Sequence, residues 1–259
     1  MNQKIVINNH YEVTINEIDE IVKKYNDIDD YVAKGNRNSI KKITLNNKKV
    51  ATIKSFKVPN IVNKFVYRFF RKSKAQRSFE YAEKLIELGF LTPTPIAYVE
   101  ETNGFSFLNS YYFSELISDD LTFREIVLDQ NWPNREEILK QFTQFTFKLH
   151  EAGIEFLDHS PGNTLIKEVD QNKYDYYLVD LNRMNFHSNM SFEIRMKNFA
   201  RLTPHKEMIE IMGKEYAKLI NKEEKEVINE MWRCTQEFQR KFNLKQERKK
   251  KLKSFFNIK

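Results

Sequence analysis

The sequence contains little cysteine, glycine or proline and no long hydrophobic run. Cys234 is the single cysteine among 259 residues, which excludes an internal disulfide and fits a reducing compartment. The longest uncharged run, Thr102 to Ser114, is too short and too polar to cross a bilayer. The first residues, MNQKIVINNH, lack the apolar segment of a signal peptide. We therefore expect a cytoplasmic protein, or one peripheral at the inner face of the cytoplasmic membrane.

Basic residues outnumber acidic ones in a composition that is otherwise globular. Hydrophobic residues make up 41% of the chain and charged residues 31%, which is not the balance of a disordered protein. The 43 lysines and arginines against 36 aspartates and glutamates leave a net charge of +7. Such a surface favours anionic partners, such as nucleotides, nucleic acids or an acidic membrane. The length suffices for one large domain or two small lobes.

The first part of the chain has the pattern of strands. The segment 43–58 alternates apolar and polar residues around an Asn-Asn pair, which predicts a hairpin. A second hairpin is expected over 96–116, turning at Thr-Asn-Gly. Between them we predict a helix that Ser73 caps and Gly89 ends.

The second part of the chain is predominantly helical. From Thr122 onward the main signal is a helical stripe of apolar residues, which predicts a buried helix face: Ile138, Leu139, Phe142, Phe145 and Leu149. Two short strands follow, and the pattern becomes helical again from Ser191. We therefore predict an α+β protein with two lobes, a small, mostly β lobe over 1–117 and a mostly α lobe over 118–259.

The segment FLDHSPGNTL, residues 156–165, and the later YYLVDLNR, 176–183, carry the chemistry. Asp158 or Asn163 alone would be an ordinary turn residue, since such side chains bond their own backbone. Asn163 begins one predicted strand and Asp180 ends the next, so a hairpin would bring them together. Their oxygens suit Mg²⁺, and Asp158 could take a proton from a hydroxyl. Together they meet the needs of phosphoryl transfer to an alcohol.

These motifs resemble the catalytic and metal loops of the protein-kinase-like superfamily. DHSPGN is close to the small-molecule phosphotransferase variant, in which Pro-Gly precedes the Asn. Within the superfamily the chain looks most like the bacterial lipopolysaccharide core kinases, the Kdo and heptose kinase family. Their short DxxR-like metal motif reads Asp180-Leu181-Asn182-Arg183 here. The resemblance spans roughly residues 30–200.

The resemblance implies a two-lobed protein-kinase-like fold that binds ATP and Mg²⁺ and phosphorylates a saccharide hydroxyl of a lipid-linked glycan. Asp158 would be the catalytic base. Asn163 and Asp180 would hold the metal. Lys54, in VATIK, would grip the α- and β-phosphates, and Glu80 on the next helix would pair with it. No nucleic-acid partner is expected.

Two of these assignments have rivals in the sequence. Lys54 has the alternative of being a surface lysine, because Lys57 lies nearby. Glu83 stands close to one helical turn after Glu80 and could take its place.

The nucleotide-binding segments are matched more loosely. In the segment SELI, 114–117, Glu115 and Ile117 would hold the adenine through backbone groups. The glycine-rich phosphate loop is reduced to KGNRNSIKK, with the single glycine Gly35. Arg37 in this loop would contact phosphates or serve as a turn residue.

The chain also departs from the kinase pattern. Phe156-Leu157 replaces the usual His-Arg before the catalytic Asp, which removes the receiver of a phosphorylated activation loop. No Ala-Pro-Glu motif follows Asp180, and a helix is expected near Ser191, which leaves little platform for a peptide. These features favour a small or lipid-linked acceptor over a protein acceptor. The alternatives are a pseudokinase that serves as a binding or scaffolding module, and a compact atypical protein kinase.

Two basic segments contain phenylalanines. The segment 62–77 has six basic residues and no acid, and its apolar residues recur at helical spacing, as in an interfacial helix. The tail 240–259 has nine basic residues and one acid. The first segment could lie on an anionic membrane, and the tail could bind anionic lipid, a phosphorylated saccharide or nucleic acid. Each could equally be a solvated face, of a packed helix in the first case and a frayed tail in the second.

Overall fold

The chain forms two compact units in the computed structural model. The first unit is Met1–Ser118 with Tyr177–Arg183, and the second is Asp119–Tyr176 with Met184–Lys259. The predicted division lay between 117 and 118, so the observed one is one residue later, and the segment 177–183 joins the first unit rather than the second. The structure describes these residues: 2–34, 38–56, 67, 71–104 and 106–255. Much of the basic segment 62–77 lies outside them.

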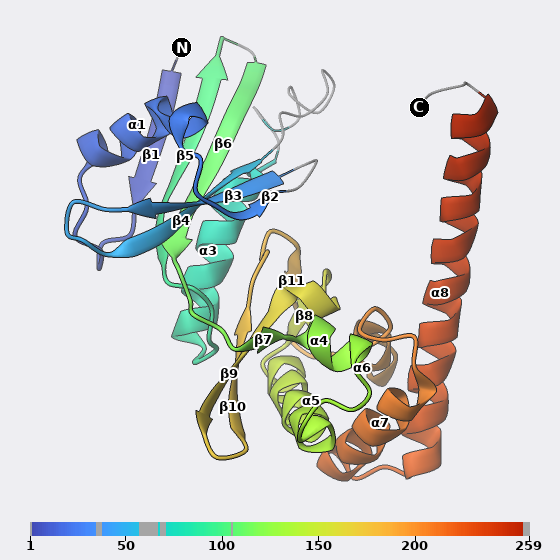
Figure 1. Ribbon diagram of the computed structural model, residues 1–259. Coiled ribbons are helices and arrows are strands. Elements are labelled where there is room, and N and C mark those ends of the chain that lie inside the picture. Colours follow the sequence, from blue (N-terminus) through green and yellow to red (C-terminus); the bar gives the residue numbers. More distant parts are fainter. Residues whose placement is uncertain (1, 35–37, 57–66, 68–70, 105, 256–259) are drawn as a thin grey trace. The chain divides into compact units, whose positions relative to one another are not determined.

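The first unit is built on a six-stranded sheet (Figure 1). The strand order is β1-β5-β6-β4-β3-β2, and every neighbouring pair is antiparallel. Both predicted hairpins are present, as β3–β4 and β5–β6, because their alternation and their turn residues agree. The strands are β1 (Asn2–Ile7), β2 (Tyr31–Lys34), β3 (Asn38–Thr44), β4 (Val50–Phe56), β5 (Pro95–Asn103) and β6 (Ser106–Glu115).

Helices accompany this sheet. They are α1 (Ile15–Lys23), the 3-10 turn η1 (Tyr25–Asp27) and α3 (Lys74–Glu87). Ser73 caps α3 by accepting a hydrogen bond from the Gln76 N–H, as predicted. Gly89, at φ +80°, reverses the chain after the helix, a conformation that favours glycine.

The two faces of the sheet pack against different helices. Ile18 and Val22 of α1 share a buried cluster with Ile53 and Phe113. Residues of the opposite face, Phe56 and Tyr98, pack with Ala75 and Phe79 of α3. Side chains alternate between the two faces along a strand. Lys54 therefore lies on the face that α3 covers, and its neighbours Ile53 and Ser55 lie on the opposite face.

The second unit is mainly helical (Figure 1). Its small sheets have the orders β10-β9-β7 and β11-β8. Its helices are α4 (Phe123–Leu128), α5 (Arg135–Glu151), α6 (Phe192–Asn198), α7 (Lys206–Ile220) and α8 (Glu224–Phe255). Its other elements are β7 (Leu121–Thr122), β8 (Ile154–Phe156), η2 (Pro161–Asn163), β9 (Thr164–Asp170), β10 (Lys173–Leu178), which runs into the first unit, and β11 (Met184–Phe186). The predicted α+β architecture, strands first and helices after, is confirmed.

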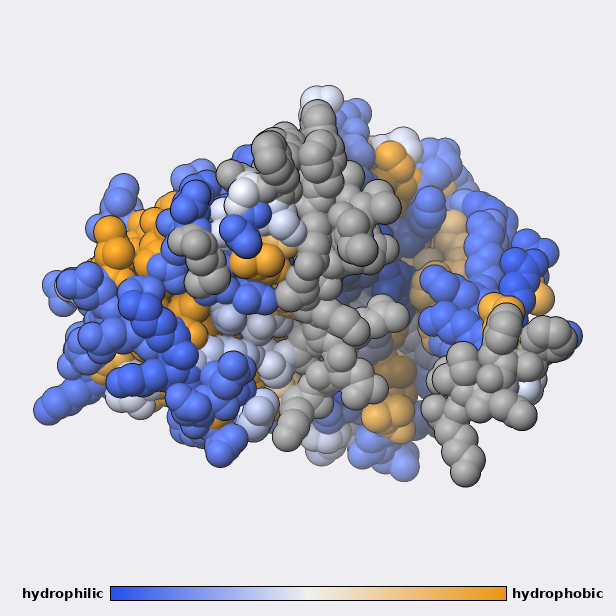
Figure 2. Space-filling model, turned by 90° about the horizontal axis from the view of Figure 1, so that it is seen from above, coloured by the Kyte–Doolittle hydropathy of each residue, from blue (hydrophilic) through white to orange (hydrophobic). Residues whose placement is uncertain are grey.

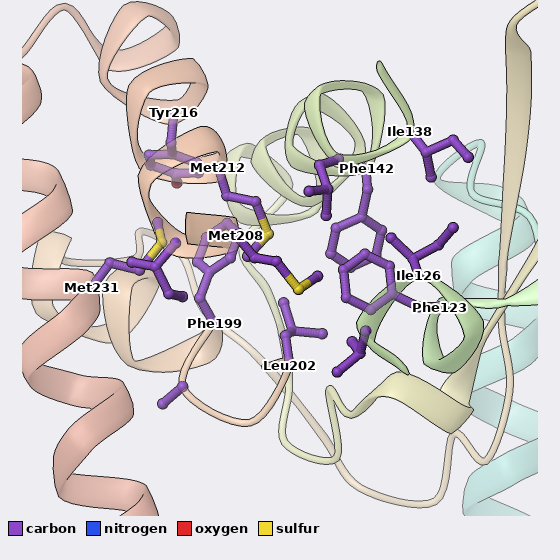
Figure 3. Packing of buried hydrophobic residues seen from close by; sticks show 14 of the residues in the cluster. Phe123, Ile126, Ile138, Phe142, Phe199, Leu202, Met208, Met212, Tyr216 and Met231 are labelled. Carbon is purple, nitrogen blue, oxygen red and sulfur yellow. The ribbon is translucent and has the colours of Figure 1, made fainter. Parts of the chain in front are cut away.

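The core of the second unit forms around the predicted stripe of α5 (Figure 3). Four of the five stripe residues are at most 1% exposed, and Phe145 is partly buried. The Phe142 ring lies 4.2 Å from that of Phe123, measured between centroids. Met208 and Met212 of α7 complete this cluster, and flexible methionines fill such irregular gaps well.

The surface is largely hydrophilic in the view of Figure 2. Among the described residues, no helix is both long and apolar enough to cross a membrane. The longest described helix, α8, has 32 residues, and its residues 240–252 are exposed and rich in lysine.

Replacement of Phe142 by alanine should destabilise the second unit by about 3–5 kcal/mol, because it empties a fully buried site. Urea unfolding followed by tryptophan fluorescence measures this, since both tryptophans, Trp132 and Trp232, lie in the second unit. Leu128→Ala is the control, because Leu128 is 74% exposed and should change stability by less than about 0.5 kcal/mol. Equal unfolding midpoints for the two variants would contradict the assignment of Phe142 to the core.

Candidate active site

Lys54 and Asp180 meet within the first unit. The Lys54 Nζ donates to Asp180 Oδ1 at 2.7 Å. Their side chains are 11% and 31% exposed, respectively. Lys54 is central in β4, opposite Ile40 of β3 and Tyr112 of β6. Two flanking strands therefore hold its backbone in place, and its phosphate-binding role stays a prediction.

Asp180 has an unusual backbone conformation. Its φ is +60°, in the left-handed region where few non-glycine residues other than Asn and Asp occur. Asn182 Nδ2 donates to the same Oδ1 at 2.5 Å. Such a conformation persists only where surrounding contacts hold it, and it is often found at functional sites.

Helix α3 contributes to this loop through Arg77. The Arg77 Nη1 donates to the backbone oxygen of Asn182 at 2.7 Å. Burial lowers the pKa of the Arg77 guanidinium, and the nearby Arg71 lowers it further. The sequence had counted Arg77 only as part of a basic segment. No local motif distinguishes it, because its partner lies more than 100 residues away in the chain.

The predicted ion pair between Lys54 and Glu80 does not form in this structure. The Glu80 carboxylate accepts from Lys72 at 2.8 and 2.9 Å and from Gln76 at 2.9 Å. Asp180 supplies the carboxylate that Lys54 binds. The rival residue, Glu83, is half-buried, and burial raises its pKa, as do Glu87 and Glu80.

The predicted nucleotide-binding segments are only partly described. Gly35 and Arg37 lie outside the described residues. The Glu115 N–H donates to Thr94 O at 2.9 Å, and the Glu115 carboxylate accepts from the Tyr11 hydroxyl at 3.2 Å. Burial and the Glu115 charge raise the pKa of Tyr11 to about 12. The adenine-binding roles of Glu115 and Ile117 remain predictions.

The second unit holds Asp158 and Asn163 together in one loop. Asp158 follows β8, and Asn163 ends the 3-10 turn η2, directly before β9. The Asn163 Nδ2 donates to the backbone oxygen of Asp158 at 2.8 Å. This bond orients the amide so that Oδ1, the atom type that a metal requires, is its remaining polar atom.

A glycine sets the approach to this loop. Gly153 joins α5 to β8 with φ +72°, and a Cβ at this position would lie 2.0 Å from the backbone oxygen of His187. The same two residues are bonded, His187 N–H to Gly153 O, at 2.8 Å. Only glycine permits both the conformation and this close approach, so the HEAG sequence directs the chain into β8.

Arg201 binds the predicted base directly. Its Nη1 donates to Asp158 Oδ1 at 2.7 Å and to the backbone oxygen of Leu157 at 3.0 Å. The side chains of Asp158 and Arg201 are 18% and 36% exposed, respectively. The sequence reading missed Arg201, since it follows α6, 43 residues after Asp158. It noted only that the usual arginine before the Asp is absent.

The buried side-chain amide of Asn198 stabilises the loop that carries Asp158. Its Nδ2 donates to Phe156 O at 2.9 Å, so Oδ1 is the acceptor. Both His150 Nε2, at 3.2 Å, and His159 Nδ1, at 3.3 Å, contact this oxygen and must therefore carry the protons. His150 Nδ1 then accepts from the Tyr216 hydroxyl at 2.8 Å.

The hydrogen bonds of His150 require it to be neutral, because its Nδ1 accepts one of them, and burial keeps both histidines neutral. Burial lowers the pKa of His159 to about 4 and that of His150 to about 3. Among the described residues His159 Nε2 has no hydrogen-bond partner, so a proton there would be buried without an acceptor. The hydrogen-bond network of Asn198, His150 and His159 is therefore uncharged.

The donor atoms suit a magnesium ion. The Asn163 amide oxygen and the Asp180 carboxylate are hard oxygen ligands. Each belongs to a different unit, and Asp180 Oδ1 is bound by Lys54 and Asn182 in this structure. Mg²⁺ commonly takes one or two protein carboxylates and completes its shell with phosphate and water, so each residue has the chemistry of a Mg²⁺ ligand, and their joint metal site stays a prediction.

Comparisons with known proteins concern the family and the fold. The sequence model of the lipopolysaccharide kinase (Kdo/WaaP) family matches residues 54–222. A solved structure of WaaP in complex with acyl carrier protein matches with a TM-score of 0.59 and 15% identity, over 92% of this chain and 97% of that one. A Rio2 kinase–ADP/Mg²⁺–phosphoaspartate complex from Chaetomium thermophilum has a TM-score of 0.46 and 16% identity, over 92% and 82%. No curated protein matches the chain in sequence.

The fold and its two loops define a protein-kinase-like phosphotransferase. Within that class, the chain belongs to the lipopolysaccharide kinase (Kdo/WaaP) family, because the family match covers well over half of its length. The match contains Lys54, Asp158, Asn163 and Asp180. The suspected family is thus confirmed, and membership implies ATP as the phosphoryl donor.

Acidification should destabilise the second unit before it affects most carboxylates. An unfolded histidine binds a proton below about pH 6.5, whereas folded His159 does so only near pH 4. Below pH 6.5 the unfolded state therefore binds more protons, and the free energy of unfolding falls as the pH drops through this window. The loss due to His159 should reach about 3 kcal/mol at pH 4.

Urea unfolding at pH 7.5, 6 and 5 measures this loss, with His159→Gln as the matched control. Glutamine can donate to Asn198 without titrating, so the variant should lose less stability between pH 7.5 and 5 than the wild type. The same pH dependence in both proteins would contradict a neutral, buried His159.

Proposed function

We propose that this protein transfers the γ-phosphoryl group of ATP to a saccharide hydroxyl of a lipopolysaccharide core, on Kdo or heptose, or of a similar glycan. The observation that carries the proposal is the family match over residues 54–222. The resolved contacts of Lys54 and Asp158 support it, because each side chain is held in a defined position by the rest of its unit.

In the proposed reaction, an acceptor oxygen forms a bond to the γ-phosphorus while the bond to the bridging oxygen of ADP breaks. Asp158 orients the acceptor hydroxyl and takes its proton. Lys54 binds the α- and β-phosphates, where its charge offsets that of the leaving ADP. Bound magnesium, held by Asn163 and Asp180, would supply further charge stabilisation to the phosphates. Most of the rate enhancement in such transfers comes from positioning and electrostatics.

Replacement of Asp158 by asparagine should reduce transfer roughly 10²–10⁴-fold, because an amide cannot take the proton. The binding of Mg·ATP should be nearly unchanged. Asp180→Ala should abolish transfer and also weaken Mg·ATP binding. The assay follows ³²P transfer to lipopolysaccharide extracted from cells that lack this protein, with ATP binding measured by calorimetry.

Asp170→Asn is the control for these variants, because Asp170 is 68% exposed and lies at the far end of β9. It should retain the wild-type rate. Near-normal transfer by Asp158→Asn would refute the role of Asp158. Nucleotide binding without transfer by the wild-type protein would favour the pseudokinase alternative.

We further propose that the protein works at the inner face of the cytoplasmic membrane, held there by the end of α8. Residues 240–252 are exposed, and the apolar residues Phe242, Leu244 and Leu252 among them are 46%, 47% and 57% exposed. Each basic residue near an anionic bilayer contributes roughly 1 kcal/mol. The nine basic residues of 240–259 could therefore hold the protein there reversibly.

Co-sedimentation with phosphatidylglycerol-containing vesicles tests this proposal. Binding should weaken steeply with salt, because exposed charges are screened beyond about 10 Å at 0.1 M ionic strength. Neutral vesicles should not bind. A chain ending at Phe242 should bind more weakly and keep its affinity for ATP. Equal recovery of both chains would refute the role of the tail, and no binding at low salt would refute membrane association.

A further inference from the structure

A cavity of about 340 Å³ lies in the second unit, beside the residues that lead into Asp158. One wall is formed by the end of β8 and the first loop residue, Leu157. The second comes from α6 and the residues after it, including Lys197 and Arg201, and the third from α8, including Phe238. Its volume is within the range of small-ligand sites.

The lining combines apolar side chains with acidic and basic ones. Ala200 and Cys234, which are buried, contribute apolar surface to the lining. Around them stand the carboxylates of Glu193 and Glu237 and basic groups that include Lys197. On α8, Glu237 is paired with Lys241 at 2.6 Å. A ligand in this cavity would thus contact hydrogen-bond donors, hydrogen-bond acceptors and apolar surface.

Arg201 connects this cavity to the predicted base. It lines the cavity, and its Nη1 donates to Asp158 Oδ1 at 2.7 Å. The Arg201 guanidinium lies over the Phe238 ring, with Cζ 5.6 Å from the centroid. Its Nε is buried and has no hydrogen-bond partner among the described residues. Arg201 therefore contacts both the cavity and Asp158, the carboxylate that would accept the proton of the acceptor hydroxyl.

We propose that this cavity binds a sugar of the acceptor, next to the hydroxyl that is phosphorylated. The inference rests on the proposed function and extends it by locating the acceptor on the second unit. A saccharide ring has an apolar face, which suits the apolar lining of Ala200, Cys234 and Phe238, and several hydroxyls that both donate and accept. An acidic substituent, a carboxylate or phosphate, would be bound by Lys197. The cavity thus suits an anionic, polyhydroxylated ligand better than an apolar one.

The test uses delipidated core oligosaccharide prepared from cells that lack this protein. Lys197→Ala and Phe238→Ala should each weaken its binding at least about tenfold, as expected for the loss of a charged hydrogen bond or an apolar platform. In the transfer assay the KM for this acceptor should rise by a similar factor. The KM for ATP should not change, because the residues predicted to hold ATP lie elsewhere. Calorimetry without ATP measures the binding independently.

Matched controls remove similar groups outside the cavity. Lys218→Ala removes an exposed lysine of α7, and Leu128→Ala an exposed apolar side chain of α4. Both should leave oligosaccharide binding unchanged. Because Lys197 is exposed, its variant should fold even if Phe238→Ala does not.

The outcomes separate this inference from the proposed function. Normal transfer with an unchanged acceptor KM in Lys197→Ala and in folded Phe238→Ala would overturn the acceptor site and leave the kinase assignment intact. Oligosaccharide binding that depends on both residues, without any transfer, would support the site and refute the proposed reaction. Neither binding nor transfer by the wild type would overturn both.

Discussion

The loop that carries Asp158 depends on the buried side-chain amide of Asn198. This amide binds Phe156 O on one side and two histidines on the other. Three residues later Arg201 binds Leu157 O and Asp158. The short segment from Asn198 to Arg201 thus contacts four consecutive residues, Phe156 to His159. A carboxylate with this support is preoriented, which is the main requirement for positioning catalysis.

This support explains how Asp158, the predicted base, can be held in place without the usual His-Arg before it. The usual His and Arg would lie within the loop. Here the amide of Asn198, at the end of α6, and the guanidinium of Arg201 bind the loop from outside it. His159, after the Asp instead of before it, is fully buried and neutral because burial lowers its pKa. The loss of the motif therefore does not imply the loss of the site.

Each of the two aspartates is paired with a cation from its own unit. Asp180 is bound by Lys54 from the middle of a strand, and Asp158 by Arg201 from a loop after a helix. Such partly exposed pairs contribute little to stability by themselves. Their contribution is to orientation, because the cations fix where the two carboxylates point. The strained backbone of Asp180 has the same meaning, since its contacts with Asn182 and Lys54 maintain a conformation that the chain would otherwise leave.

Much of the architecture follows from local signals. The alternation around Asn46 and Asn47 determined the β3–β4 hairpin, the cap of Ser73 determined the start of α3, and the α5 stripe determined the core of the second unit. The order of Lys54, Asp158, Asn163 and Asp180 was sufficient to recognise the family. These features are short-range, or they depend only on order along the chain, so a single sequence contains them.

The partners of these residues were decided by tertiary structure. The sequence paired Lys54 with Glu80 because a familiar pattern implied it, whereas the folded chain pairs Glu80 with Lys72 and Lys54 with Asp180. It noted Arg77 only as a basic residue and passed over Asn198 and Arg201. Each of these three binds a backbone oxygen or a carboxylate that is 42 or more residues distant in sequence, and no local pattern encodes such contacts. Sequence determined which groups the site contains, and the packing of distant segments determined how they are held.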